Sequence, residues 1–209
     1  MIKKVFELFK PFKKENSQSV EEKIDSLFDD LENETIKISL GSDLESFCED
    51  FSMNISVFRE EMKSQYGFIL PPVRIKSDYG LQENELQVWV NEKCIYNEFL
   101  VPSKNYLESE IPNILQEIFD KNISEIFSNN LAEKYVNQVQ KNNCWLVWNL
   151  TSRLSVVEIK AILVDLINQK KSIGNITYIF EKICEQLYLE ESFLERKPHK
   201  ISERLIKIL

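Results

Sequence analysis

The residue types best suited to chemistry in this chain are four cysteines and a single histidine. The histidine, His199, follows a proline in a charged stretch. The cysteines lie about 40 to 50 residues apart, and no two of them form a Cys-x-x-Cys pair: Cys48, Cys94, Cys144 and Cys184. Because a zinc site needs clustered Cys and His ligands, the sequence predicts no metal centre. We interpret the cysteines as reduced, mostly buried thiols of a cytoplasmic protein.

Other catalytic patterns are also missing from the sequence. No cysteine lies in a nucleophile motif, and the chain has four glycines and neither a GxGxxG nor a Walker A pattern. Adjacent carboxylates such as Glu60-Glu61 are expected on solvated helix faces. The sequence therefore predicts a protein without enzymatic activity and without a cofactor.

The charge is acidic overall and basic at the start. The formal net charge of −8 argues against a nucleic-acid partner. Residues 1–14 carry five lysines against Glu7. This segment is either a solubilising tail or a weak anchor on an anionic membrane or a partner protein. No apolar run approaches the ~18 residues of a membrane span, so we expect a cytoplasmic protein, or one peripheral to the inner membrane. The anchor residues would be Lys3, Lys4, Phe6, Phe9 and Lys10.

Periodicity divides the chain into a basic tail (residues 1–18), an α/β subdomain (19–107) and a helical subdomain (108–209). The pattern Ser19-x-x-Glu22 is a capping box and begins one helix. In the α/β subdomain we expect strands at 35–40, 73–77, 86–90 and 93–100, the last two forming a hairpin that turns at Asn91-Glu92. We also expect a helix at 54–65 that Gly67 ends in a left-handed conformation. In the helical subdomain we expect helices at 112–128, 131–141, 155–169, 175–188 and 200–208. The predicted fold class is α+β.

The run GFILPPVRI at residues 67–75, with the helix before it and the hairpin after it, resembles one protein family. It is similar to the first cytoplasmic subdomain of the export-gate protein of flagellar and virulence type III secretion systems, the FlhA/SctV family. Further stretches at 117–127, 162–169 and 172–183 resemble helices of the family's ring-forming third subdomain, in the same order. The resemblance covers roughly residues 35–209 and implies a related fold.

The sequence also departs from the family. Only residues 101–109 stand where the family inserts its second subdomain, and we find no counterpart of its membrane region or fourth subdomain. The Thr-His-Leu that borders the family's chaperone-binding surface is Asn113-Ile114-Leu115 here. After Ser172-Ile173, the family's Arg-Asp is Gly174-Asn175.

The resemblance implies a non-enzymatic module that docks secretion substrates, chaperones or apparatus components, and a homo-oligomer stays open. The alternative is a scaffold or adaptor that works outside secretion, held by its N-terminal helix. Trp145 and Trp148 fall on a short predicted helix and form either a core or subdomain-interface cluster or a partner-binding patch. The candidate partner-binding residues are Phe68, Pro71, Pro72, Arg74, Asn113, Ile114, Trp145 and Trp148.

Overall fold

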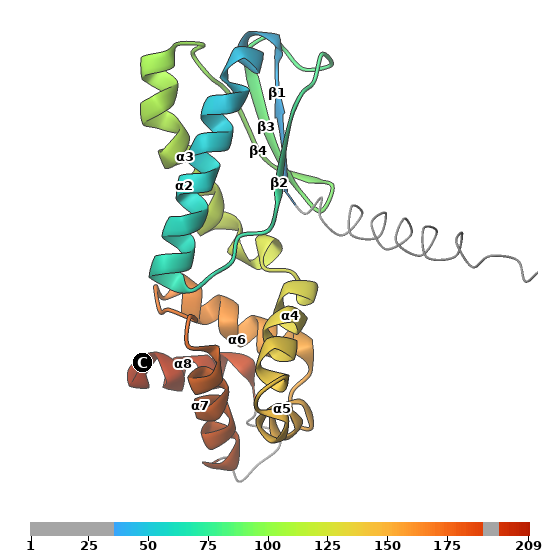
Figure 1. The fold of residues 1–209 in the computed structure, drawn as a ribbon, viewed down its shortest axis with the longest axis vertical. Coiled ribbons are helices and arrows are strands. Elements are labelled where there is room, and N and C mark those ends of the chain that lie inside the picture. The colour runs from blue at the N-terminus through green and yellow to red at the C-terminus, as the bar shows by residue number, and fades with distance from the viewer. Residues whose placement is uncertain (1–35, 190–196) are drawn as a thin grey trace, which may run out of the picture. The chain divides into compact units, whose positions relative to one another are not determined.

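The computed structural model of the protein describes residues 36–189 and 197–209. The described residues belong to one compact unit of the chain. The basic start of the chain and the helix expected after Ser19 therefore lie outside the described residues. Figure 1 shows the described elements with their labels.

A four-stranded mixed sheet occupies the first half of the described chain. Its strands are β1 (Ile36–Leu40), β2 (Val73–Ser77), β3 (Glu85–Val90) and β4 (Lys93–Phe99), in the order β2-β1-β3-β4. Strands β1 and β2 are parallel, whereas β3 is antiparallel to both β1 and β4. The β3–β4 hairpin turns at Asn91 and Glu92, which both have positive φ, as a two-residue type I′ turn requires. The four predicted strands and the turn are confirmed.

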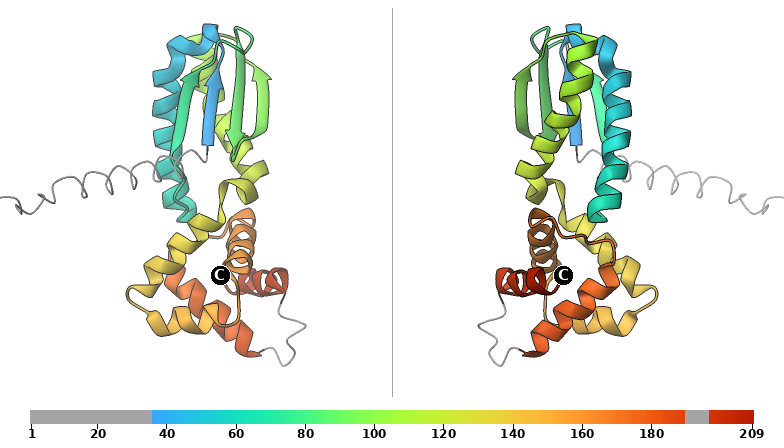
Figure 2. Two further views of the ribbon diagram at one scale, coloured as in Figure 1. Left: turned by 90° about the vertical axis from the view of Figure 1, so that its right-hand side faces the viewer. Right: turned by 90° about the vertical axis from the view of Figure 1, so that its left-hand side faces the viewer.

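Alternation along the strands gives the sheet one buried face. Ile36, Ile38 and Leu40 are at most 5% exposed. Two helices cover the sheet, α2 (Cys48–Tyr66) and α3 (Lys104–Ile126), as both views of Figure 2 show. Between β1 and α2 the chain makes a short 3₁₀ turn, η1 (Ser42–Phe47). On the other face, Lys37 lies opposite Trp89, with its Nζ 5.1 Å from the ring centroid.

From Lys104 onward, every regular element of the described residues is a helix. After α3 come α4 (Asn129–Gln140), α5 (Cys144–Thr151), α6 (Val156–Asn168), α7 (Ile176–Leu189) and α8 (Pro198–Ile208). Ser155 and Glu158 form a capping box at the start of α6. The α+β fold class, with strands first and helices after, is confirmed.

Helices α2 and α3 begin six and eight residues earlier than the sequence predicted, and α4 and α8 each begin two residues earlier. Helix α2 begins at Cys48, not at residue 54, because Phe51 adds a buried contact one turn upstream. Helix α3 begins at Lys104, eight residues before the expected start, so Pro112 lies inside it. A proline removes one backbone hydrogen bond within a helix. The apolar side chains of Leu107 and Ile111, in the turns before Pro112, are nevertheless buried in the core. The free energy of this burial outweighs the loss of the hydrogen bond.

Candidate protein-interaction surface

The Gly67–Pro72 turn, which carries the sequence resemblance, is built into the core. Gly67 ends α2 with φ +63° and ψ 15°, the left-handed conformation that the sequence predicted. Phe68 is fully buried, and its ring lies 5.4 Å from Phe119 of α3 and 5.6 Å from Phe127. Arg59 of α2 donates a hydrogen bond to the Pro71 carbonyl at 3.4 Å. This turn is therefore mainly structural.

Backbone and side-chain groups of the helical half hold the turn in place. The Tyr135 hydroxyl donates to the Gly67 carbonyl at 3.0 Å and accepts from the Ile69 backbone N–H at 3.1 Å. Burial raises the pKa of Tyr135, so the hydroxyl stays protonated and can act as the donor. The backbone N–H of Ile173 donates to the Tyr66 carbonyl at 2.7 Å. These contacts join the end of α2 to segments more than sixty residues away.

The residues predicted to bind a partner divide into buried and exposed groups. Phe68 and Ile114 are buried, so neither side chain can reach a partner on the folded protein. Pro71 is half-buried. Pro72, Arg74 and Asn113 are exposed, and Asn113 donates its side-chain amide to the Ser109 carbonyl at 3.2 Å. The predicted anchor residues Lys3, Lys4, Phe6, Phe9 and Lys10 lie outside the described residues.

Trp145 and Trp148 are the most informative of the exposed set. They lie one turn apart on α5 and are 74% and 61% exposed, so the interpretation of this pair as a core cluster is wrong. The opposite side of α5 buries Val147 and Leu150. Helix α5 is therefore apolar on both faces, and the face that carries Trp145 and Trp148 is the one exposed to solvent. Their rings pack edge to face, with centroids 5.9 Å apart and planes at 82°.

An arginine–tyrosine pair links the end of α5 to α7. Arg153, two residues after the end of α5, places its guanidinium carbon 3.9 Å from the ring centroid of Tyr188 on α7. Tyr188 is 62% exposed, and α5 and α7 pack against each other. We call the set Trp145, Trp148, Arg153 and Tyr188 the α5 aromatic surface. The sequence did not reveal the last two, because 35 residues separate them and no local pattern links them.

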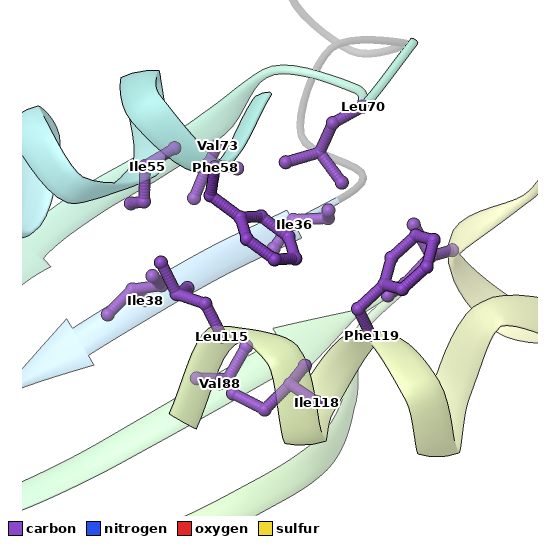
Figure 3. Close-up of a pocket in the computed structure, with 11 residues that line it drawn as sticks. Ile36, Ile38, Ile55, Phe58, Leu70, Val73, Val88, Leu115, Ile118 and Phe119 are labelled. Atoms are coloured by element: carbon purple, nitrogen blue, oxygen red, sulfur yellow. The ribbon is translucent and has the colours of Figure 1, made fainter. Parts of the chain in front are cut away.

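The cavity between the sheet, α2 and α3 does not suggest a small-molecule site. One void of about 30 Å³ lies between the sheet, α2 and α3, where Phe58, Leu115 and Phe119 point inward (Figure 3). It is about the size of one water molecule and entirely apolar, so it is a packing defect of the core. A shallow depression of about 350 Å³ beside α6 is lined by residues such as Asn129, Lys160 and Asp165.

Titratable groups of the described residues form no metal-binding cluster. No three His, Cys, Asp or Glu side chains in residues 36–189 and 197–209 are grouped so as to hold a metal ion. Burial raises the pKa of Cys184, which makes its thiol a poor nucleophile. Cys94 and Cys144 are exposed rather than buried, contrary to the expectation for most of the thiols. In the same part of the chain, no helix combines the length and apolarity that a membrane crossing requires.

Comparison with known proteins finds similarity in structure and none in sequence. No protein-family model matches the chain, and no curated protein sequence matches it. The Chlamydia pneumoniae CdsV protein is similar to it with a TM-score of 0.64 and 14% identity, over 82% of this chain and 69% of that one. The nonameric EscV cytosolic domain of a type III secretion system gives a TM-score of 0.63 and 16% identity, over 83% of this chain and 63% of that one.

A third similar structure is the complex of Chlamydia pneumoniae CdsV with CdsO, with a TM-score of 0.62 and 15% identity, over 78% of this chain and 67% of the other. The chain thus spans 63 to 69% of the length of these three structures. At such low identity the likeness establishes the fold alone. The chain has the fold of export-gate cytoplasmic domains, as the sequence resemblance predicted.

Proposed function

We propose that this chain is a non-enzymatic protein-interaction module of a type III secretion apparatus, where it docks export substrates, chaperones or apparatus components. The observation that supports this proposal most is the shared fold with the EscV cytosolic domain over 83% of the chain. The functional part of the proposal goes beyond that likeness, because one fold can serve several functions.

The α5 aromatic surface gives the proposal a physical basis. Trp, Tyr and Arg are the residue types that contribute most to binding at protein interfaces, and all three are present together on this surface. An exposed tryptophan pair leaves apolar area in water, which a partner protein would cover. Assembly with further copies of the chain is part of the proposal, since the similar EscV domain is nonameric. The CdsV–CdsO complex supports a protein partner in the same way.

Secretion by the source bacterium tests the proposal. We expect deletion of the gene to reduce the amount of secreted type III substrates, and the wild-type chain to restore it. Affinity capture of a tagged chain from the same cells should recover proteins of the secretion apparatus. Unchanged secretion together with capture of unrelated proteins would overturn the proposal and favour the alternative, an adaptor that works outside secretion.

A further inference from the structure

The residues around the α5 aromatic surface carry an unusual charge pattern. No Asp or Glu occurs between Glu133 and Glu158, although the chain has 34 acidic residues among 209, or about one in six. The same stretch contains three cations: Lys134, Lys141 and Arg153. In an acidic protein, this stretch of the sequence is locally positive, and it contains the two exposed tryptophans.

These cations are not neutralised by the described part of the protein. Within residues 36–189 and 197–209, Lys134, Lys141 and Arg153 form no ion pair, and both lysines are exposed. Helix α7, which packs on α5, does carry carboxylates. Of these, Glu185 is engaged by Lys182 of its own helix at 2.7 Å. No carboxylate of residues 36–189 and 197–209 pairs with these three cations, so this part of the chain leaves their charge available to a partner.

The geometry of Arg153 favours a carboxylate as the group it recognises. Its guanidinium lies against the Tyr188 ring, and such stacking fixes the plane of the group without using its N–H donors. A planar guanidinium with free donors fits a carboxylate in a two-pronged arrangement. Lipid recognition usually depends on clusters of about four to eight lysines or arginines, and only three cations are present here. The pattern thus favours an acidic polypeptide over an anionic membrane.

We propose that the α5 aromatic surface binds an acidic amphipathic segment of a partner protein. Leucine or phenylalanine side chains of the segment cover Trp145 and Trp148, and its carboxylates pair with Lys141 and Arg153. This inference rests on the proposed function as a protein-interaction module, and adds the chemistry of the partner. Burial of the two indole rings supplies most of the affinity, whereas the charge pairs supply selectivity and a dependence on salt.

Binding of synthetic peptides to the purified full-length chain tests the proposal. The probe is a helical peptide with Leu and Phe at i, i+3, i+4 and i+7 and Glu at the remaining positions. The comparison peptides replace every Glu by Lys, or every Leu and Phe by Ser. Calorimetry gives the affinity, and the indole N–H signals of Trp145 and Trp148 locate the site. We expect only the first peptide to bind, and more weakly as salt is raised.

Variants make the test specific. The double variant W145A/W148A should bind the acidic peptide roughly tenfold more weakly or worse, and Lys141→Glu should weaken binding several-fold. The matched controls are Tyr79→Ala, which removes an aromatic ring that is 78% exposed elsewhere, and Lys104→Glu, which reverses a charge on an exposed lysine of α3. Both controls should bind like the wild-type chain. Circular dichroism checks that each variant is folded.

Three results would overturn the proposal. The first is equal binding of the acidic and the lysine peptides, and the second is equal binding by wild-type chain and W145A/W148A. The third is tryptophan-dependent binding to phosphatidylglycerol vesicles without binding to the acidic peptide, which would assign the surface to a membrane. Peptide binding with unchanged secretion in the gene deletion would contradict only the proposed function. Impaired secretion without peptide binding would contradict only this inference.

Discussion

The hydroxyl of Tyr135 on α4 bonds to the backbone of Gly67, 68 residues earlier in the chain, at 3.0 Å. The same oxygen accepts a hydrogen bond from the Ile69 N–H at 3.1 Å. The ring of Tyr135 also stacks on Phe127, with centroids 5.8 Å apart and planes at 16°. One side chain of the helical half thus fixes the turn between α2 and β2.

Removal of this hydroxyl should destabilise the protein. In Tyr135→Phe, the Gly67 carbonyl and the Ile69 N–H both lose their partner in a largely buried setting, at an expected cost of about 1–3 kcal/mol. Urea unfolding measures the change. Tyr79→Phe is the control, since its hydroxyl makes only long contacts of 3.4 and 3.5 Å with Glu45 on the surface. A loss equally small in both variants would show that the bonds to Tyr135 contribute nothing.

Gly67→Ala should cost more than a left-handed helix end alone would suggest. An alanine at positive φ is unfavourable by about 1 kcal/mol. In addition, a Cβ at this position would lie 2.1 Å from both the N and the Cα of Gly174, so the two segments would have to move apart. Thermal and chemical unfolding should show a loss clearly above 1 kcal/mol.

Gly80→Ala provides the matched control for that substitution. At Gly80, the nearest atom to an added Cβ is a side-chain oxygen of Asp78 at 3.2 Å. A flexible side chain can move, so we expect little change in the melting temperature. If the melting temperature of Gly67→Ala equals those of Gly80→Ala and the wild-type chain, the close approach of Gly67 to Gly174 is not important for stability.

Glu85 should contribute to the pH dependence of stability. Its carboxylate accepts from the Gln82 N–H at 3.0 Å and from the Gln87 amide at 2.8 Å. These bonds hold the pKa of Glu85 below its ordinary value of 4.5. The folded protein therefore binds fewer protons than the unfolded chain, so this contribution is complete above pH 4.5 and disappears as the pH falls through the lowered pKa.

The variant Glu85→Gln has no charge to titrate at this position. Between about pH 5 and about pH 3, its free energy of unfolding should fall less steeply than that of the wild-type chain. Urea unfolding at a series of pH values in this window measures both slopes. Parallel curves would mean that the Gln82 and Gln87 bonds do not stabilise the ionised carboxylate.

Two aromatic substitutions should differ greatly in their effect on the free energy of unfolding. Phe68 is fully buried and contacts Phe119 and Phe127, so Phe68→Ala should cost about 3–5 kcal/mol. Trp145 is 74% exposed, so Trp145→Ala should change the free energy of unfolding by no more than about 0.5 kcal/mol. Denaturant unfolding compares the two. A large loss in Trp145→Ala would show that this ring supports the fold and is not primarily a binding residue.

The sequence by itself determined the order and type of the elements. Alternation of apolar residues at 36–40 and a helical period after residue 108 are local properties that the backbone imposes on any chain. For the same reason, Gly67 could be recognised as a helix end and Asn91-Glu92 as a turn. The starts of α2 and α3 were not determined locally, because Phe51, Leu107 and Ile111 extend these helices only through the core that covers them.

Only the tertiary structure decided which residues form the candidate site. Helix α5 is apolar on both sides, so its pattern could not show whether Val147 or Trp148 faces the core; packing against α4 and α7 decides this. The Arg153–Tyr188 contact and the approach of Gly67 to Gly174 join residues far apart in the chain. Local periodicity carries no information about such pairs, because they form only when separate segments compete for the same buried space.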